Sequence, residues 1–194
     1  MEFKLRVQNS FAFTNTWVMM NEKGTARENG GSDSMPIHNF VIENKSEINE
    51  SIYTSYSWDT HGVIHKSGLM AEEHAYLEDE FISYIQDSLN WLNTWNPSIC
   101  KRCSGLNNYG ITVIEEKDAL LKFHQLIRAW IDVFNLAPDQ IKLTGDYCFD
   151  GNEQRGYYEK LIYNRVELIN ELNKLANMAK DAELNGKCIL HFGI

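Results

Sequence analysis

Residues 71–95 read AEEHAYLEDEFISYIQDSLNWLNTW, and the spacing of their apolar residues predicts a long amphipathic helix over Ala71–Trp95. At 100° per residue, one side of that helix collects six apolar side chains: Leu77, Phe81, Ile82, Ile85, Leu89 and Leu92. Asn96-Pro97 is expected to end the helix, because the residue before a proline is disfavoured in the α conformation.

A second stripe of the expected helix alternates acids with large aromatic side chains. Tyrosine and tryptophan are enriched at protein interfaces, and carboxylates around them would steer a basic partner. A plain boundary between the core and a solvated acidic face is the alternative interpretation. The predicted partner-binding residues are Glu73, Tyr76, Glu80, Tyr84, Asp87 and Trp91.

The charge of the chain is uneven. The 194 residues carry a net charge of −9, and residues 1–100 alone hold 6 basic and 14 acidic side chains. Ser67–Cys100 contains no Lys or Arg. This distribution argues against direct nucleic-acid binding and against an anionic membrane surface, since both need basic side chains. A basic protein partner is compatible with it.

Length and composition predict one globular domain over residues 1–194. No run of residues is long and apolar enough to span a bilayer, and the N-terminus lacks the apolar core of a signal peptide. We therefore expect a cytoplasmic protein. In that reducing compartment, the four cysteines are expected to be thiols or metal ligands rather than disulfides.

The first part of the chain is expected to form an antiparallel meander. Alternating or β-branched runs predict strands over residues 2–8, 11–20, 37–42 and 51–58, with a loop over residues 21–36.

The remainder is expected to alternate strands and helices. Strands are predicted over 109–114, 140–144 and 187–194, and helices over 116–136 and 153–184, with a turn-rich loop over 145–152. The fold class that follows is α+β: a mixed sheet with an antiparallel N-terminal meander and three main helices packed mostly on one face. A doubly wound α/β sheet is the alternative.

Cys100-Lys101-Arg102-Cys103 is the clearest short motif. A gap of two residues lets both thiolates bind one Zn²⁺, and the intervening cations favour the thiolate form. A structural zinc site usually has two such pairs, so another cysteine or a histidine would have to complete this one. Two unrelated loop thiols are the alternative.

Catalytic motifs are missing from the sequence: it has no nucleophile elbow, phosphate-binding loop or dinucleotide fingerprint. His124 and His191 are expected to be hydrogen-bonded core histidines rather than catalytic bases. The sequence therefore favours a non-catalytic protein without a cofactor, although it does not settle the question of an enzyme.

The leading functional hypothesis is a cytoplasmic binding protein that recognises a basic protein partner through the acidic-aromatic helix. An immunity protein, or another small acidic inhibitor such as an anti-defence protein, would have this character. The alternative is a zinc-binding protein or metal-dependent enzyme that uses the Cys100/Cys103 pair.

Overall fold

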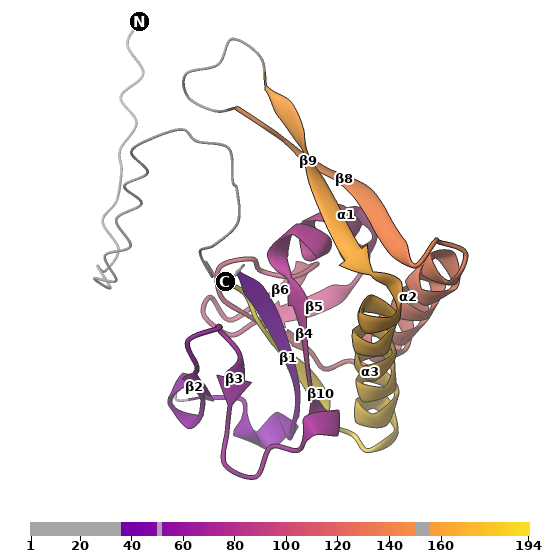
Figure 1. The fold of residues 1–194 in the computed structure, drawn as a ribbon. Helices are drawn as coiled ribbons and strands as arrows, with labels where there is room; N and C mark the ends of the chain where they lie inside the picture. Colours follow the sequence, from indigo (N-terminus) through magenta and orange to yellow (C-terminus); the bar gives the residue numbers. More distant parts are fainter. Residues whose placement is uncertain (1–35, 50–51, 150–155) are drawn as a thin grey trace, which may run out of the picture. The chain divides into compact units, whose positions relative to one another are not determined.

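The computed structural model describes residues 36–49, 52–149 and 156–194, all of which belong to the compact unit Asp33–Ile194 (Figure 1). The strands expected over residues 2–8 and 11–20, and the loop expected over 21–36 apart from Pro36, lie outside the described residues. The expectation of one domain over residues 1–194 therefore stays a prediction.

A six-stranded sheet forms the centre of the described unit, with the strand order β4-β1-β10-β7-β5-β6. Every pairing in it is antiparallel. The strands are β1 (Ile37–Glu43), β4 (His74–Glu78), β5 (Asn93–Asn96), β6 (Lys101–Ser104), β7 (Ile111–Ile114) and β10 (Cys188–Phe192).

The helices α1 (Asp79–Leu89), α2 (Lys117–Asn135) and α3 (Arg165–Leu184) share one hydrophobic core with one face of this sheet. Phe40 of β1 and Ile189 of β10 are fully buried in that core, together with Phe123 of α2 and Leu172 of α3. The predicted α+β class with three main helices is confirmed. Parallel pairings, which a mixed sheet would also contain, are not found among the described strands.

The opposite face of the sheet is covered by the segment between β1 and β4. This segment contains the short 3₁₀ helices η1 (Lys45–Glu47), η2 (Ile52–Ser55) and η3 (Ala71–Glu73), and the two-residue strands β2 (Ser57–Trp58) and β3 (Ile64–His65). Ile52, Tyr56 and Ile64 pack there against Val41 and Leu190. Among the described residues 52–58, the strand predicted over 51–58 is found only at Ser57–Trp58.

Of the long helix predicted over Ala71–Trp95, only Asp79–Leu89 is α-helical, so the prediction is wrong in its extent. The stretch forms η3, then β4, then α1, and finally β5. In β4, Ala75 and Leu77 are buried against the helices, and Tyr76 pairs with Asn39 of β1. Ala75 and Leu77 are two residues apart, as a strand requires, but Leu77 also lies four residues before Phe81, as a helical stripe requires. The position of Leu77 therefore did not separate the two structures.

A second correction concerns residues 145–184. Residues 145–148 of the expected loop and residues 157–164 of the expected helix instead belong to a two-stranded ribbon of β8 (Gln140–Cys148) and β9 (Tyr157–Asn164), which extends past α1 in Figure 1. The rest of the expected helix, from residue 165 to residue 184, is helical as predicted. The helix α3 begins only at Arg165, where the side chain of Asn164 accepts hydrogen bonds from two backbone N–H groups of its first turn.

Candidate functional site

A hollow of about 400 Å³ lies between the start of α1 and the ribbon β8–β9. None of the described residues that line it is a Lys or Arg. Four of them carry carboxylates: Asp79 and Glu80 from α1, Asp146 from β8 and Glu159 from β9. Ser83, Tyr84, Thr144, Gly145 and Cys148 complete its lining. We call this feature the acidic hollow.

Glu80 is the carboxylate of the acidic hollow whose oxygen Oε2 is shielded from solvent and has no hydrogen-bond partner among the described residues. Burial, together with the negative charges of Glu78, Asp79 and Glu159, raises the pKa of Glu80. A cation placed in the hollow would reverse this effect, because an opposite charge favours the ionised carboxylate.

Cys148 also lies in this negative environment. Loss of solvent and the nearby carboxylates of Glu159 and Asp146 raise the pKa of its thiol. The thiol is therefore held in its protonated form at neutral pH, which is the opposite of what a nucleophilic cysteine requires.

Asp79 connects the hollow to the core. Its Oδ1 lies 2.8 Å from Nε2 of His38, and Nδ1 of His38 lies 2.8 Å from Nε2 of His191. Because a carboxylate only accepts, His38 donates from Nε2 to Asp79, and the neutral His191 then donates from Nε2 to His38. Burial lowers the pKa of both histidines, so both rings are neutral near pH 7.

The two histidines belong to neighbouring strands, with His38 on β1 and His191 on β10. Both are fully buried, and His191 Nδ1 has no partner within the described part of the chain. The prediction that His124 is hydrogen-bonded is confirmed, since its Nδ1 lies 2.8 Å from the carbonyl oxygen of Ala176. His191 is likewise a hydrogen-bonded core histidine.

Four of the six predicted partner-binding residues share one side of α1 and the turn after it. Glu80, Tyr84 and Asp87 are spaced four and three residues apart on the helix, and Trp91 follows two residues after its end. Tyr84 is 39% exposed and Trp91 is 63% exposed. The backbone carbonyl of Trp91 accepts a hydrogen bond from Lys122 Nζ.

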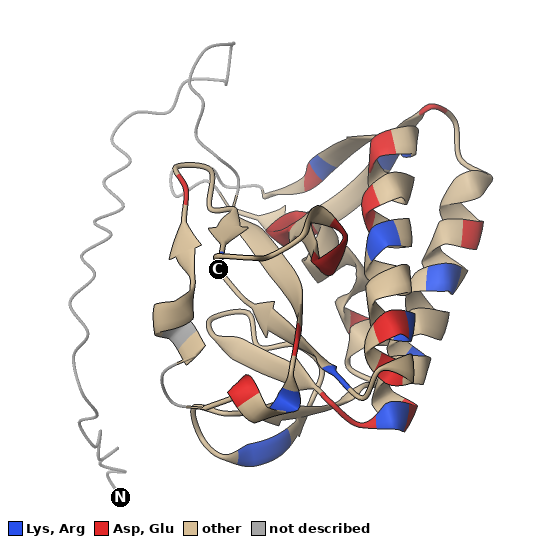
Figure 2. Cartoon of the chain, turned by 90° about the horizontal axis from the view of Figure 1, so that it is seen from below, with Lys and Arg blue, Asp and Glu red and all other residues tan. Residues whose placement is uncertain are grey.

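The other two predicted residues do not lie on α1. Glu73 belongs to η3 and forms an ion pair with Lys187 at 3.3 Å, while Tyr76 belongs to β4. The charges of α1 also differ from those of the other two helices. Figure 2 shows charges of both signs on the two long helices, whereas α1 has Asp79, Glu80 and Asp87 and no basic residue.

The sequence did not identify Asp146 and Glu159 as members of a site. They come from two strands of one ribbon, and they meet Asp79 and Glu80 only because that ribbon passes alongside α1. The one sequence signal available was the strand-like run Tyr157–Tyr163, which our prediction placed within a helix.

The Cys100/Cys103 pair lies on the exposed hairpin of β5 and β6, with Cys100 in the turn at a positive φ of 49°. Each thiol is within reach of a nearby backbone carbonyl, that of Pro97 or that of Lys101. Across the described ranges, no group of three or more His, Cys, Asp and Glu side chains is arranged to hold a metal ion. Zinc binding by this pair stays a prediction.

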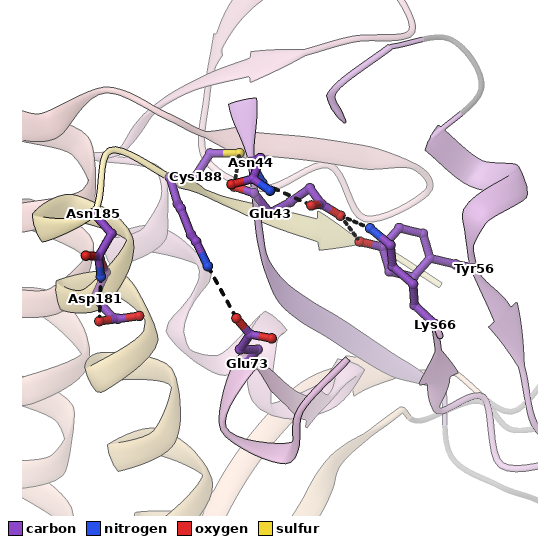
Figure 3. Close-up of polar contacts among 9 residues, drawn as sticks. Glu43, Asn44, Tyr56, Lys66, Glu73, Asp181, Asn185 and Cys188 are labelled. Atoms are coloured by element: carbon purple, nitrogen blue, oxygen red, sulfur yellow. Dashed lines mark hydrogen bonds and ion pairs between the residues drawn. The ribbon is translucent and has the colours of Figure 1, made fainter. Parts of the chain in front are cut away.

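A further buried carboxylate, Glu43, lies at the end of β1 on the other face of the sheet (Figure 3). It accepts hydrogen bonds from Tyr56 Oη at 2.8 Å and from the backbone N–H of Asn44 at 3.0 Å, and it forms an ion pair with Lys66. These contacts hold the segment that contains η2 and β3 against the sheet. Both oxygens of the carboxylate have partners within the fold, so Glu43 has a structural role.

No helix in the described ranges combines the length and the apolar character needed to cross a membrane. Comparisons with protein-family models, with curated proteins and with solved structures give no match. A proposal for the function therefore rests on the chemistry of the surface.

Proposed function

We propose that this protein is a non-catalytic, cytoplasmic binding protein that recognises a basic protein partner, in the manner of an immunity protein or another small inhibitor. The contact surface in this proposal is the acidic hollow together with the exposed side of α1. Glu73 and Tyr76, which the sequence grouped with this surface, are not required for it.

The observation that carries the proposal is the set of four carboxylates in the acidic hollow, which has no compensating cation among its described lining residues. Holding like charges together in a partly desolvated place is unfavourable, as the raised pKa of Glu80 shows. A Lys or Arg side chain from a partner would offset that cost on binding. Natural interfaces use such complementary charges to accelerate association and to reject wrong partners.

Aromatic residues beside the hollow supply the second component of an interface. Tyr84 lines the hollow, and Trp91 is exposed just beyond the end of α1. Large aromatic side chains of this kind often dominate binding energy, because they bury much area with few rotatable bonds. The charges would then determine the rate and specificity of binding, and the aromatic side chains much of the affinity.

A charge-reversal experiment tests the proposal. Binding of a fluorescein-labelled oligolysine peptide is measured by anisotropy across a salt series, for the wild type and for a variant with Glu80→Lys and Asp87→Lys. We expect the variant to bind about tenfold or more weakly at low salt, because two attractive charges become repulsive.

The matched control reverses two exposed acids that lie outside α1, Glu47→Lys and Glu72→Lys, and so has the same net charge. We expect it to lose much less affinity than the first variant. Equal losses in the two variants would show that only net charge matters, and would contradict a defined binding site on α1.

The zinc-binding alternative has its own test. Elemental mass spectrometry of the protein, purified without added metal or chelator, would detect about one zinc per chain if Cys100 and Cys103 contribute to a site. A Cys103→Ser variant should then lose that metal.

A further inference from the structure

An apolar groove of about 710 Å³ adjoins the acidic hollow. Its walls come from the end of α2, the loop that follows, and the first half of β8. Lys142 is the one charged side chain among its described lining residues. Val133 is 54% exposed and Leu136 is 88% exposed, so the groove presents apolar surface to solvent. Exposed apolar patches of this kind often mark interaction sites.

The aromatic wall of the groove is held in place by its own contacts. Trp130 stacks on Phe134 with ring centroids 5.6 Å apart, and Tyr84 meets Trp130 edge-on at 5.9 Å. The indole Nε1–H of Trp130 donates a hydrogen bond to Ser88 Oγ at 3.0 Å. Because these side chains are already fixed, a ligand would spend little conformational entropy on ordering them.

The groove and the acidic hollow are two halves of one continuous surface. Residues 140–143 of β8 line the groove, while Thr144, Gly145, Asp146 and Cys148 of the same strand line the hollow. Tyr84 lines both and forms the boundary between them. At about 3.4 Å per residue along a strand, the centres of the two halves are about 15 Å apart.

We propose that this surface binds one amphipathic segment of the partner, with a large apolar side chain in the groove and Lys or Arg side chains in the hollow. The inference rests on the proposed function and specifies the chemistry of the segment that is recognised. An extended segment would separate its apolar anchor from its basic cluster by about four or five residues.

Charge complementarity selects this occupant over a second copy of the chain. A copy would bring a net charge of −9 toward a hollow that already holds four carboxylates. A wholly basic segment would leave the apolar groove exposed, and a wholly apolar one would leave the carboxylates of the hollow without a cation. Only a segment that carries both chemistries matches both halves of the surface.

The first test uses three fluorescein-labelled peptides with the wild-type protein. Two have leucines grouped at one end and lysines at the other, in the two possible chain directions, and the third has the same composition with the residues alternating. We expect one grouped peptide to bind about tenfold more tightly than the alternating one, because only it satisfies both halves at once. Equal affinities for all three peptides would overturn the inference.

The second test uses substitutions that have two opposing effects on peptide binding: they add attractive negative charge, and they remove apolar surface from the groove. Val133→Glu with Leu136→Glu adds negative charge, which would strengthen a purely electrostatic attraction to a basic peptide. It also places carboxylates in the groove, which should weaken the grouped peptide about tenfold. The matched control, Val166→Glu with Leu184→Glu, changes the same residue types at similarly exposed positions on α3.

The pattern of results separates the two proposals. If the groove variant binds as tightly as its control, or more tightly, the amphipathic segment is refuted, while oligolysine binding through the hollow can still hold. If Glu80→Lys changes the affinity for neither oligolysine nor the grouped peptides, the proposed function fails. In the expected case, the indole N–H signal of Trp130, assigned with Trp130→Phe, shifts with the grouped peptide and not with oligolysine.

Discussion

Glu43 and Glu80 are carboxylates on opposite sides of the same sheet, and their surroundings act on them in opposite directions. Burial alone would raise the pKa of both. At Glu43, hydrogen bonds from Lys66 and Tyr56 outweigh burial, and the pKa is lowered. At Glu80, burial is reinforced by three further acids, and the pKa is raised. The difference separates a carboxylate that stabilises the fold from one that is available to bind a cation.

The largest expected effect on stability comes from removing the cation beside Glu43, which would leave that carboxylate unpaired, as Glu80 is. A Lys66→Met variant leaves the buried Glu43 without its cation, and we expect the free energy of unfolding to fall by about 2–3 kcal/mol in urea denaturation. Lys66 is 26% exposed, which keeps the loss below that of a fully buried ion pair. Adding Glu43→Gln should recover part of the loss. No change in Lys66→Met would show that the ion pair does not hold this segment.

Acid pH tests the buried histidines of the central sheet. Burial lowers the pKa of His38, of His191 and of His74, the last to about 4. Between the unfolded-state value of about 6.5 and these lower values, the unfolded chain binds more protons, so stability must fall as pH falls. For the partly exposed His74 alone, we expect a loss of about 1–2 kcal/mol between pH 6.5 and pH 4.

The measurement is urea denaturation at a series of pH values. A His74→Gln variant should lose less stability over that range than the wild type, and the exposed His61→Gln should follow the wild type. A flat profile from pH 6.5 to pH 4 in the wild type would contradict neutral buried histidines.

The smallest expected effect on stability comes from neutralising Glu80. Because the folded state raises the pKa of Glu80, its ionised form destabilises the fold at neutral pH. Glu80→Gln should therefore increase stability by about 0.5–1 kcal/mol at pH 7, with the gain vanishing as pH falls through the raised pKa. Asp87→Asn, at an exposed position of the same helix, should change little. A loss of stability in Glu80→Gln would mean that Glu80 is structural, like Glu43.

Elements with a single clear pattern were predictable from the sequence. The helix expected over 116–136 is α2, and the strands expected over 37–42 and 187–194 contain most of β1 and all of β10. In α2, the buried residues Leu120, Ile127, Ile131 and Phe134 follow the helical period.

Elements whose patterns fit two periods were not predictable. In β4, Ala75 and Leu77 alternate as a strand requires, but Leu77 also continues the helical stripe of Phe81 and Ile85. Pairing of β4 with β1, a contact between distant parts of the chain, decides the outcome, and local propensity does not encode it.

The candidate site was predictable only in part. Glu80, Tyr84 and Asp87 could be grouped because they are neighbours on one helix. Asp146 and Glu159 join them through the ribbon, and the groove beside Tyr84 needs the end of α2 and the start of β8 together. Such a surface is defined by the packing of several elements, so residue spacing along one of them cannot identify it.

The most direct test of a binding role for the acidic hollow is the pKa of Glu80, measured by NMR of its side-chain carboxyl carbon with and without the lysine-containing peptides. Glu43 serves as the internal reference in the same spectra. We predict a raised pKa for Glu80 in the free protein, a clear fall when peptide binds, and an unchanged, lowered pKa for Glu43. A peptide that binds without lowering the pKa of Glu80 would contradict the proposal that its cations enter the hollow.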